Sequence, residues 1–189
     1  MTPADIISFW FADGLDQWRS AWFVRSESFD QEIADRFSAG LDPAGRGEFD
    51  DWANEPDGAL ALCILLDQFP RNLFRGTAKA FTFDQKAREI ASLAISAKLD
   101  QSLPPTARVF LYLPFEHSES LADQDRSVAL FETLREHPPH GEPGGSVDYA
   151  WRHHDVIRRF GRFPHRNIVL GRHNTAEEEA YLAGPGAGF

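Results

Sequence analysis

Residues 58–69 read GALALCILLDQF, and every side chain from Ala59 to Leu66 is apolar. A helix of this composition has no polar face to turn toward water, so it is expected to lie buried at the centre of the molecule. Asp57 stands where a helix-capping residue is needed, and Pro70 is expected to end the helix because it lacks a backbone N–H. The stretch therefore predicts one central helix around which the rest of the chain packs.

The chain on both sides of this stretch reads as further helices. Apolar residues recur every three or four positions between capping residues and Gly or Pro, and no segment alternates as a strand does. We expect helices over residues 3–11, 48–53, 58–69, 106–112, 120–137 and 147–160, and a short one after Thr175. A further helix carries Phe29, Ile33 and Phe37 and is capped by Ser26 or Ser28, and another runs from its cap Asp84 to about Lys98. The sequence thus predicts an all-α fold of stacked helical hairpins in a single domain over residues 1–189.

Composition narrows the class of protein. The formal net charge is −10, and because residues 150–172 hold six arginines and one aspartate (+5), the remainder carries −15. So acidic a remainder repels phosphate backbones, which argues against nucleic-acid binding but leaves room for one anionic ligand in a local basic pocket. No secretion signal begins the chain, and no apolar run approaches the roughly 18 residues of a membrane span. We expect a soluble, cytoplasmic protein, not bound to a membrane, with its single cysteine, Cys63, in the core.

The end of the central helix carries an acid. Asp67 lies in the last turn, where the helix macrodipole disfavours negative charge. Burying an unpaired carboxylate is strongly unfavourable, so we expect an arginine to hold Asp67. Arg71 follows directly after Pro70.

Three motifs carry a resemblance to a known family. They are DQFPRN at residues 67–72, HSE at residues 117–119 and FGRFPHRN at residues 160–167. With their flanking segments they resemble the bacterial family catalogued as domain-of-unknown-function family 924, over almost the whole chain. His153 stands where this family usually has a histidine before the last motif. The resemblance implies a tetratricopeptide-like helical fold with a shared polar cluster, and it implies no activity, because the family has none assigned.

The polar residues of these motifs are expected to meet, because stacked hairpins bring helix ends together. The predicted catalytic residues are His117, Glu119 and His153, with His117 as a general base paired with Glu119 or His153. The predicted ligand-binding residues are Asp67, Gln68, Arg71, Asn72, Gln124, Arg162, His165, Arg166 and Asn167.

The arginines of this set indicate the class of ligand. Arg71, Arg162 and Arg166 can each hold an anion through two N–H groups, and a helix start near Asn167 would add backbone donors. We therefore hypothesise that the cluster binds a small anionic molecule. Whether the protein also turns that molecule over, as an enzyme, stays open. We assign no cofactor to it.

Two alternatives concern the same residues. The cluster can be a buried ion-pair network that only fixes the packing of the hairpins. A metal site would use His117, Glu119, Asp123 and His153, but nothing here matches a zinc pattern such as HExxH, and the dyad of His154 and Asp155 lacks further spaced ligands. We assign no metal.

A third alternative is a protein- or peptide-binding module. Helical arrays grip peptides in a concave groove, and in that case the polar cluster would be purely structural. The side chains that could serve it, if exposed, are Trp10, Trp18, Trp22 and Trp52.

Overall fold

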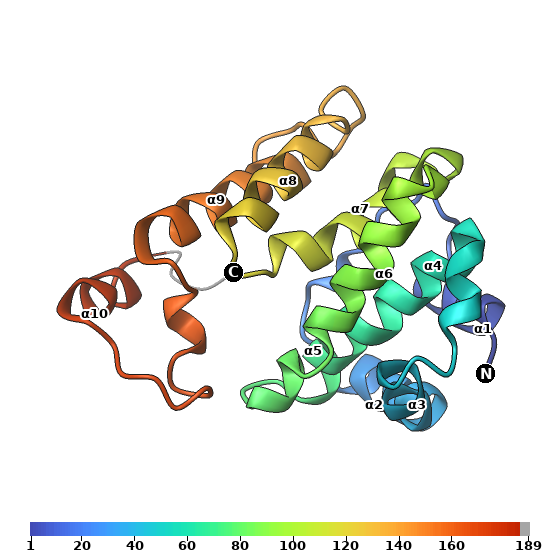
Figure 1. Cartoon of the computed structure of the whole chain (residues 1–189), viewed down its shortest axis with the longest axis horizontal. Coiled ribbons are helices and arrows are strands. Elements are labelled where there is room, and N and C mark those ends of the chain that lie inside the picture. Colours follow the sequence, from blue (N-terminus) through green and yellow to red (C-terminus); the bar gives the residue numbers. More distant parts are fainter. Residues whose placement is uncertain (186–189) are drawn as a thin grey trace. The chain divides into compact units, whose positions relative to one another are not determined.

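The computed structural model describes residues 1–185, and within this range the chain forms α-helices, short 3-10 helices and one π turn, with no strand (Figure 1). The all-α prediction is confirmed. The chain divides into two compact units, Met1–Arg75 with Lys79–Pro114, and Gly76–Ala78 with Phe115–Phe189. Each unit is described by itself below. The single-domain and tetratricopeptide-like expectations stay predictions.

The first unit is built around one long helical rod. Its helices are α1 (Pro3–Trp10), α2 (Glu27–Phe37), α3 (Leu41–Gly45), α4 (Pro56–Cys63), α5 (Phe69–Leu73), α6 (Asp84–Ser96) and most of α7 (Pro105–Glu116). Short 3-10 helices lie between them: η1 (Ser20–Trp22), η2 (Ser38–Gly40), η3 (Asp50–Asn54), η5 (Ala78–Phe81) and η6 (Leu99–Ser102). Both α1 and α6 pack against α4, which gives α4 the central place that its apolar composition predicted (Figure 1).

The central helix is longer than expected, and Pro70 does not end it. A π turn, η4 (Ile64–Gln68), joins α4 to α5, so that the chain stays helical from Pro56 to Leu73. In this turn the Phe69 N–H donates to the Ile64 carbonyl, five residues back. The wider turn leaves room for a proline ring that would crowd an ordinary helix, and Pro70 needs no backbone acceptor. The helix also begins one residue before Asp57, because Pro56 takes the first helical position.

Aromatic side chains fill the space between α1, α2 and the central helix. Trp10 is fully buried, Trp22 is 5% exposed, and the Trp22 indole N–H donates to the Trp10 carbonyl at 2.8 Å. These two tryptophans belong to the core, so they offer no binding surface. Trp18, by contrast, is 41% exposed, and its ring stacks on Phe23 at 5.3 Å.

The second unit is a helical hairpin followed by a basic turn. It contains the end of α7, then α8 (Leu121–Glu132), α9 (Ser146–Phe160), the 3-10 helix η7 (Pro164–Arg166) and α10 (Ala176–Leu182). Helices α8 and α9 pack along each other (Figure 1). Gly161 ends α9 in the left-handed conformation, with φ 68°, and Thr175 with Glu178 forms the predicted capping box of α10.

Three predicted boundaries in this region are wrong. Pro114 lies inside α7, which runs on to Glu116, because the buried Phe115 keeps the last turn packed despite the backbone hydrogen bond that the proline loses. Helix α8 ends at Glu132 and not near His137. Residues 167–170 form turns, so no helix N-terminus lies there to bind an anion. Within residues 1–185, no helix is long and apolar enough to cross a membrane.

Candidate functional site

In the first unit, Arg71 holds two acids together. Its Nη1 lies 3.1 Å from Oδ1 of the fully buried Asp67, and its two terminal nitrogens donate to both carboxylate oxygens of Asp84 at 2.9 and 3.0 Å. The expectation that an arginine holds Asp67 is confirmed. Burial alone would lower the pKa of Arg71, but Asp67 and Asp84 raise it above its usual range. Arg71 therefore stays charged and compensates both carboxylates.

The other predicted residues of the first unit extend this network. Gln68 Nε2 donates to Asp67 Oδ2 at 2.6 Å, and Asn72 Nδ2 donates to Asp30 Oδ1 at 2.7 Å. Arg75 pairs with the same Asp30 carboxylate at 2.9 Å. Asp67, Gln68, Arg71 and Asn72 thus take part in ion pairs and amide contacts that join the central helix to α2 and α6. This arrangement fits the alternative in which these residues form an ion-pair network that only fixes the packing of the helices.

In the second unit, two histidines lie against the fully buried ring of Phe163, and a third histidine lies beside one of them. The rings of His153 and His165 each lie 5.5 Å from the Phe163 ring, and the Arg166 guanidinium lies 4.3 Å above it. The His117 ring stands 6.2 Å from that of His153, and Arg166 Nη1 donates to the His117 carbonyl at 2.9 Å.

One acid from the end of α7 joins these side chains. Glu116 is 3% exposed, and its Oε1 lies 3.2 Å from His153 Nδ1. His153 Nδ1 also lies 2.8 Å from the Tyr149 carbonyl, an acceptor that requires Nδ1 to carry the proton. We call Glu116, His117, His153, His165 and Arg166 the histidine cluster.

Burial and neighbouring positive charges lower the pKa values of two histidines in this cluster. Burial, with His117 and Arg166 adding positive charge, lowers the pKa of His153 well below its ordinary 6.5. Burial and then Arg166 lower the pKa of His165 to about 4. Both imidazoles are therefore neutral at pH 7, and a neutral imidazole retains a lone pair that can accept a proton.

Two further arginines of the second unit, Arg162 and Arg172, hold carboxylates of the same chain. Arg162 donates to both carboxylate oxygens of Glu178 at 2.6 and 2.7 Å. Arg172 donates to both carboxylate oxygens of Glu119 at 2.6 and 2.9 Å, and the Phe163 N–H donates to Glu119 as well. Burial would raise the pKa of Glu119, but these donors lower it below its usual range. Glu119 is thus engaged with Arg172, and the carboxylate that meets a histidine here is Glu116.

Two buried amides fix the backbone around the histidine cluster. Gln124 Nε2 donates to the carbonyls of Glu116 and Ser118 at 2.6 and 2.7 Å, which ties the end of α7 to α8. Asn167 Nδ2 donates to Asn174 Oδ1 at 2.8 Å and closes the turn after η7. Both residues were predicted to bind a ligand, and in the structure their amide nitrogens donate to oxygens of this chain.

The structure places the predicted residues in two groups. Asp67, Gln68, Arg71 and Asn72 belong to the first unit, and the remaining eight belong to the second. Sequence reasoning missed Asp84, Glu116, Glu178 and Arg172, which are the ionic partners. Glu116 could have been found, because it directly precedes the HSE motif. It was overlooked because Pro114 predicted a loop there.

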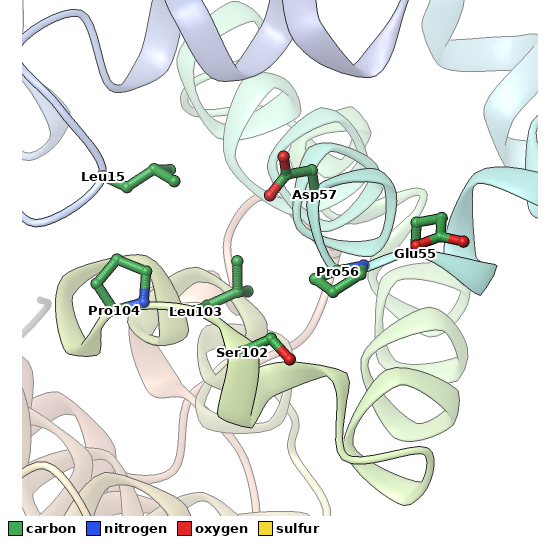
Figure 2. Close-up of a pocket in the computed structure, with 7 residues that line it drawn as sticks. All are labelled: Leu15, Glu55, Pro56, Asp57, Ser102, Leu103 and Pro104. Carbon is green, nitrogen blue, oxygen red and sulfur yellow. The ribbon is translucent and has the colours of Figure 1, made fainter.

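A metal centre and a pocket were also considered as parts of the site, within the residues that the structure describes. Within residues 1–185, no three His, Cys, Asp or Glu side chains are placed to hold a metal ion. A pocket of about 240 Å³ opens at the start of α4, where Figure 2 shows Glu55 and Asp57 on one side and Leu15 and Ser102 to Pro104 around the rest. No predicted site residue lines it.

Fold and site together define an all-α protein with a cluster of histidine, arginine and glutamate side chains. The chain belongs to the family described as bacterial protein of unknown function, DUF924, whose model matches residues 6–186. It is 43% identical to a solved structure, the protein of unknown function ATU0120 from Agrobacterium tumefaciens, with 96% of each chain covered and a TM-score of 0.85. A comparison with curated proteins found no match.

Proposed function

We propose that the histidine cluster of the second unit binds a small anionic molecule. The observation that carries this proposal is the gathering of His153, His165 and the Arg166 guanidinium against the Phe163 ring, with the His117 ring beside that of His153. The Arg166 guanidinium supplies a buried positive charge there, although the whole chain has a formal net charge of −10. Positive charge that is confined to one desolvated place favours one small anion and not an extended polyanion.

The direct contacts change which residues are expected to meet the anion. Arg71 and Arg162 each hold a carboxylate of this chain through two hydrogen bonds, so they support the fold and do not serve as ligand donors. His117 and His165 are partly exposed, and Arg166 stands beside them. The proposed ligand-binding residues are therefore His117, His165 and Arg166.

If the bound molecule is also turned over, His153 is the proposed general base. Its Nδ1–H is oriented by Glu116 and the Tyr149 carbonyl, an arrangement that fixes the tautomer and leaves the lone pair on Nε2. The low pKa of His153 keeps its imidazole neutral at pH 7, and a general base must be neutral to accept a proton. In this proposal Glu116 takes the place that the sequence suggested for Glu119.

Sulfate, phosphate and citrate are expected to raise the melting temperature of the wild-type chain, and Arg166→Ala is expected to abolish the rise. An anion at 100 times its dissociation constant adds about 2.7 kcal/mol, with roughly 2–4 °C of melting temperature per kcal/mol. Arg158→Ala is the matched control, because the Arg158 side chain is 67% exposed and lies outside the cluster. Each variant is compared with its own ligand-free melting temperature. An equal rise in Arg166→Ala and the wild type would contradict the proposal.

A second candidate function is peptide binding by the first unit. Phe23 and Val24 are 55% and 60% exposed, and the stacked pair of Trp18 and Phe23 forms an apolar surface with them. Surfaces of this kind mark interaction sites in many soluble proteins. If no anion stabilises the chain in the melting experiment, this surface becomes the leading candidate and the histidine cluster is a structural network.

We also propose a cytoplasmic location, with no nucleic-acid partner. The support is chemical. The one cysteine, Cys63, is a buried free thiol whose pKa burial raises, as suits a chain that needs no oxidising compartment. The excess of acidic over basic residues, 29 against 19, repels phosphate backbones. Cell fractionation with an antibody to the chain tests the location.

A further inference from the structure

The pocket at the start of α4 belongs entirely to the first unit and contains no residue of the histidine cluster. Its volume of about 240 Å³ is below the range typical of drug-sized ligands and suits a smaller molecule. Most of the side chains that line it are apolar, namely Leu15, Pro56, Leu103 and Pro104. The pocket can therefore receive a short hydrocarbon group.

Hydrogen bonds within the first unit fix the walls of this pocket. Arg108 Nε donates to the Leu103 carbonyl at 2.8 Å and holds the segment after η6 in place. The Thr106 hydroxyl donates to the Asp16 carbonyl at 3.1 Å, which ties the loop that carries Leu15 to the start of α7. The walls are thus held by the chain itself, as in most small-molecule sites, which are largely formed before the ligand binds.

Two carboxylates line the pocket, and the fold does not use them. Glu55 is the N-cap residue of α4, but its side chain makes no capping hydrogen bond. Asp57 lies in the first turn of the same helix, and in Figure 2 its carboxylate points toward the side of the pocket where Leu15 and Pro104 lie. Within residues 1–185, neither carboxylate forms an ion pair or accepts a hydrogen bond. The position near a helix start favours both charges but leaves their oxygens open to a ligand.

We infer that this pocket binds a short aliphatic amine in its protonated form. The ammonium group donates to the carboxylates of Glu55 and Asp57, and the Ser102 hydroxyl is a further acceptor. The hydrocarbon part of the amine packs against the apolar side chains of the pocket. Two carboxylates and a hydroxyl do not suffice for a bare hard cation, which takes about six or more oxygen ligands. The inference goes beyond the proposed anion binding, because the two sites belong to different units.

The experiment is an NMR titration of the full chain, labelled with nitrogen-15, with butylamine at constant ionic strength. Aliphatic amines, like lysine, are protonated at pH 7. We expect the backbone amide signals of Glu55, Asp57 and Ser102 to shift together and to saturate with one dissociation constant. Butanol and butyrate share the hydrocarbon chain but lack the ammonium group. They are expected to bind at least about tenfold more weakly, because the charge-assisted hydrogen bonds are lost.

Two variants test the carboxylates and the cavity separately. Asp57→Asn removes one charge and keeps the shape of the side chain, so it is expected to weaken butylamine binding about tenfold. Its matched control is Asp42→Asn, because Asp42 also lies in the first turn of a helix and is exposed, but does not line the pocket. Ser102→Phe places a ring at the pocket and keeps both carboxylates, and it is expected to abolish binding.

Each outcome decides for or against the amine site. No saturating shift with butylamine, or equal affinity for butylamine and butyrate, would overturn the inference. Equal butylamine affinity in Asp57→Asn and Asp42→Asn would also overturn it, because the amine would then meet surface carboxylates in general. Binding that persists in Ser102→Phe would place the amine outside the pocket. The amide spectrum shows whether each variant is folded; if Ser102→Phe is not, the comparison of the two asparagine variants decides.

Discussion

Replacing Arg71 by alanine is expected to lower the free energy of unfolding by about 3–5 kcal/mol, as for other buried ion pairs that lose one partner. The substitution leaves the carboxylates of Asp67 and Asp84, both buried, without the guanidinium that compensates them. Urea denaturation followed by circular dichroism measures the loss. The same network joins the central helix to α6, so the effect is expected in the first unit.

The control for this prediction is Arg75→Ala. Arg75 also pairs with an aspartate, Asp30, but its side chain is 41% exposed, and exposed pairs contribute about 0–1 kcal/mol. A loss below about 1 kcal/mol for Arg71→Ala, equal to that of the control, would show that the buried network does not support the fold.

Replacing Phe163 by alanine is expected to cost a similar amount, about 3–5 kcal/mol, because a large aromatic side chain leaves a cavity that its neighbours only partly fill. Phe163 is fully buried and packs with Val156 and Ile157, while His153, His165 and Arg166 contact its ring. Removal of the ring is therefore also expected to weaken sulfate binding by the histidine cluster.

Phe160→Ala is the matched control for this second prediction. Phe160 belongs to the same apolar cluster but is only partly buried and contacts Tyr181 instead of the histidines. Its substitution is expected to destabilise the chain less and to leave sulfate affinity unchanged. Thermal unfolding and calorimetric titration measure the two effects. Equal sulfate affinity in Phe163→Ala and Phe160→Ala would contradict the role of the ring in positioning the histidine cluster.

The fold was largely predictable because local composition determines it. The apolar stretch from Ala59 to Leu66 can only be central, and capping residues such as Thr175 mark helix starts through hydrogen bonds with near neighbours. Pro70 and Pro114 were expected to end their helices, because a proline lacks the backbone N–H that continues a helix. At these positions the helix continues, next to a π turn at Pro70 and next to the buried Phe115 at Pro114. Such tertiary effects leave no periodic pattern in the sequence.

The candidate site was predictable by residue type but not by partner. A buried Asp67 requires a cation, and that expectation holds because the energetic reason is general. The pairing of Arg172 with Glu119 joins residues 53 positions apart, and no spacing rule connects them. Glu116 meets His153 only because α7 continues past Pro114. Which residues form ion pairs therefore depends on how the helices pack against one another, and the sequence does not show this packing.

Histidine NMR during a sulfate titration tests the central claim most directly. If the histidine cluster takes the anion, the ring signals of His117, His153 and His165 shift together and saturate with one dissociation constant, while those of the exposed His137 and His173 stay in place. Shifts confined to the exposed histidines, or no saturating shift in the three cluster rings, would contradict the account.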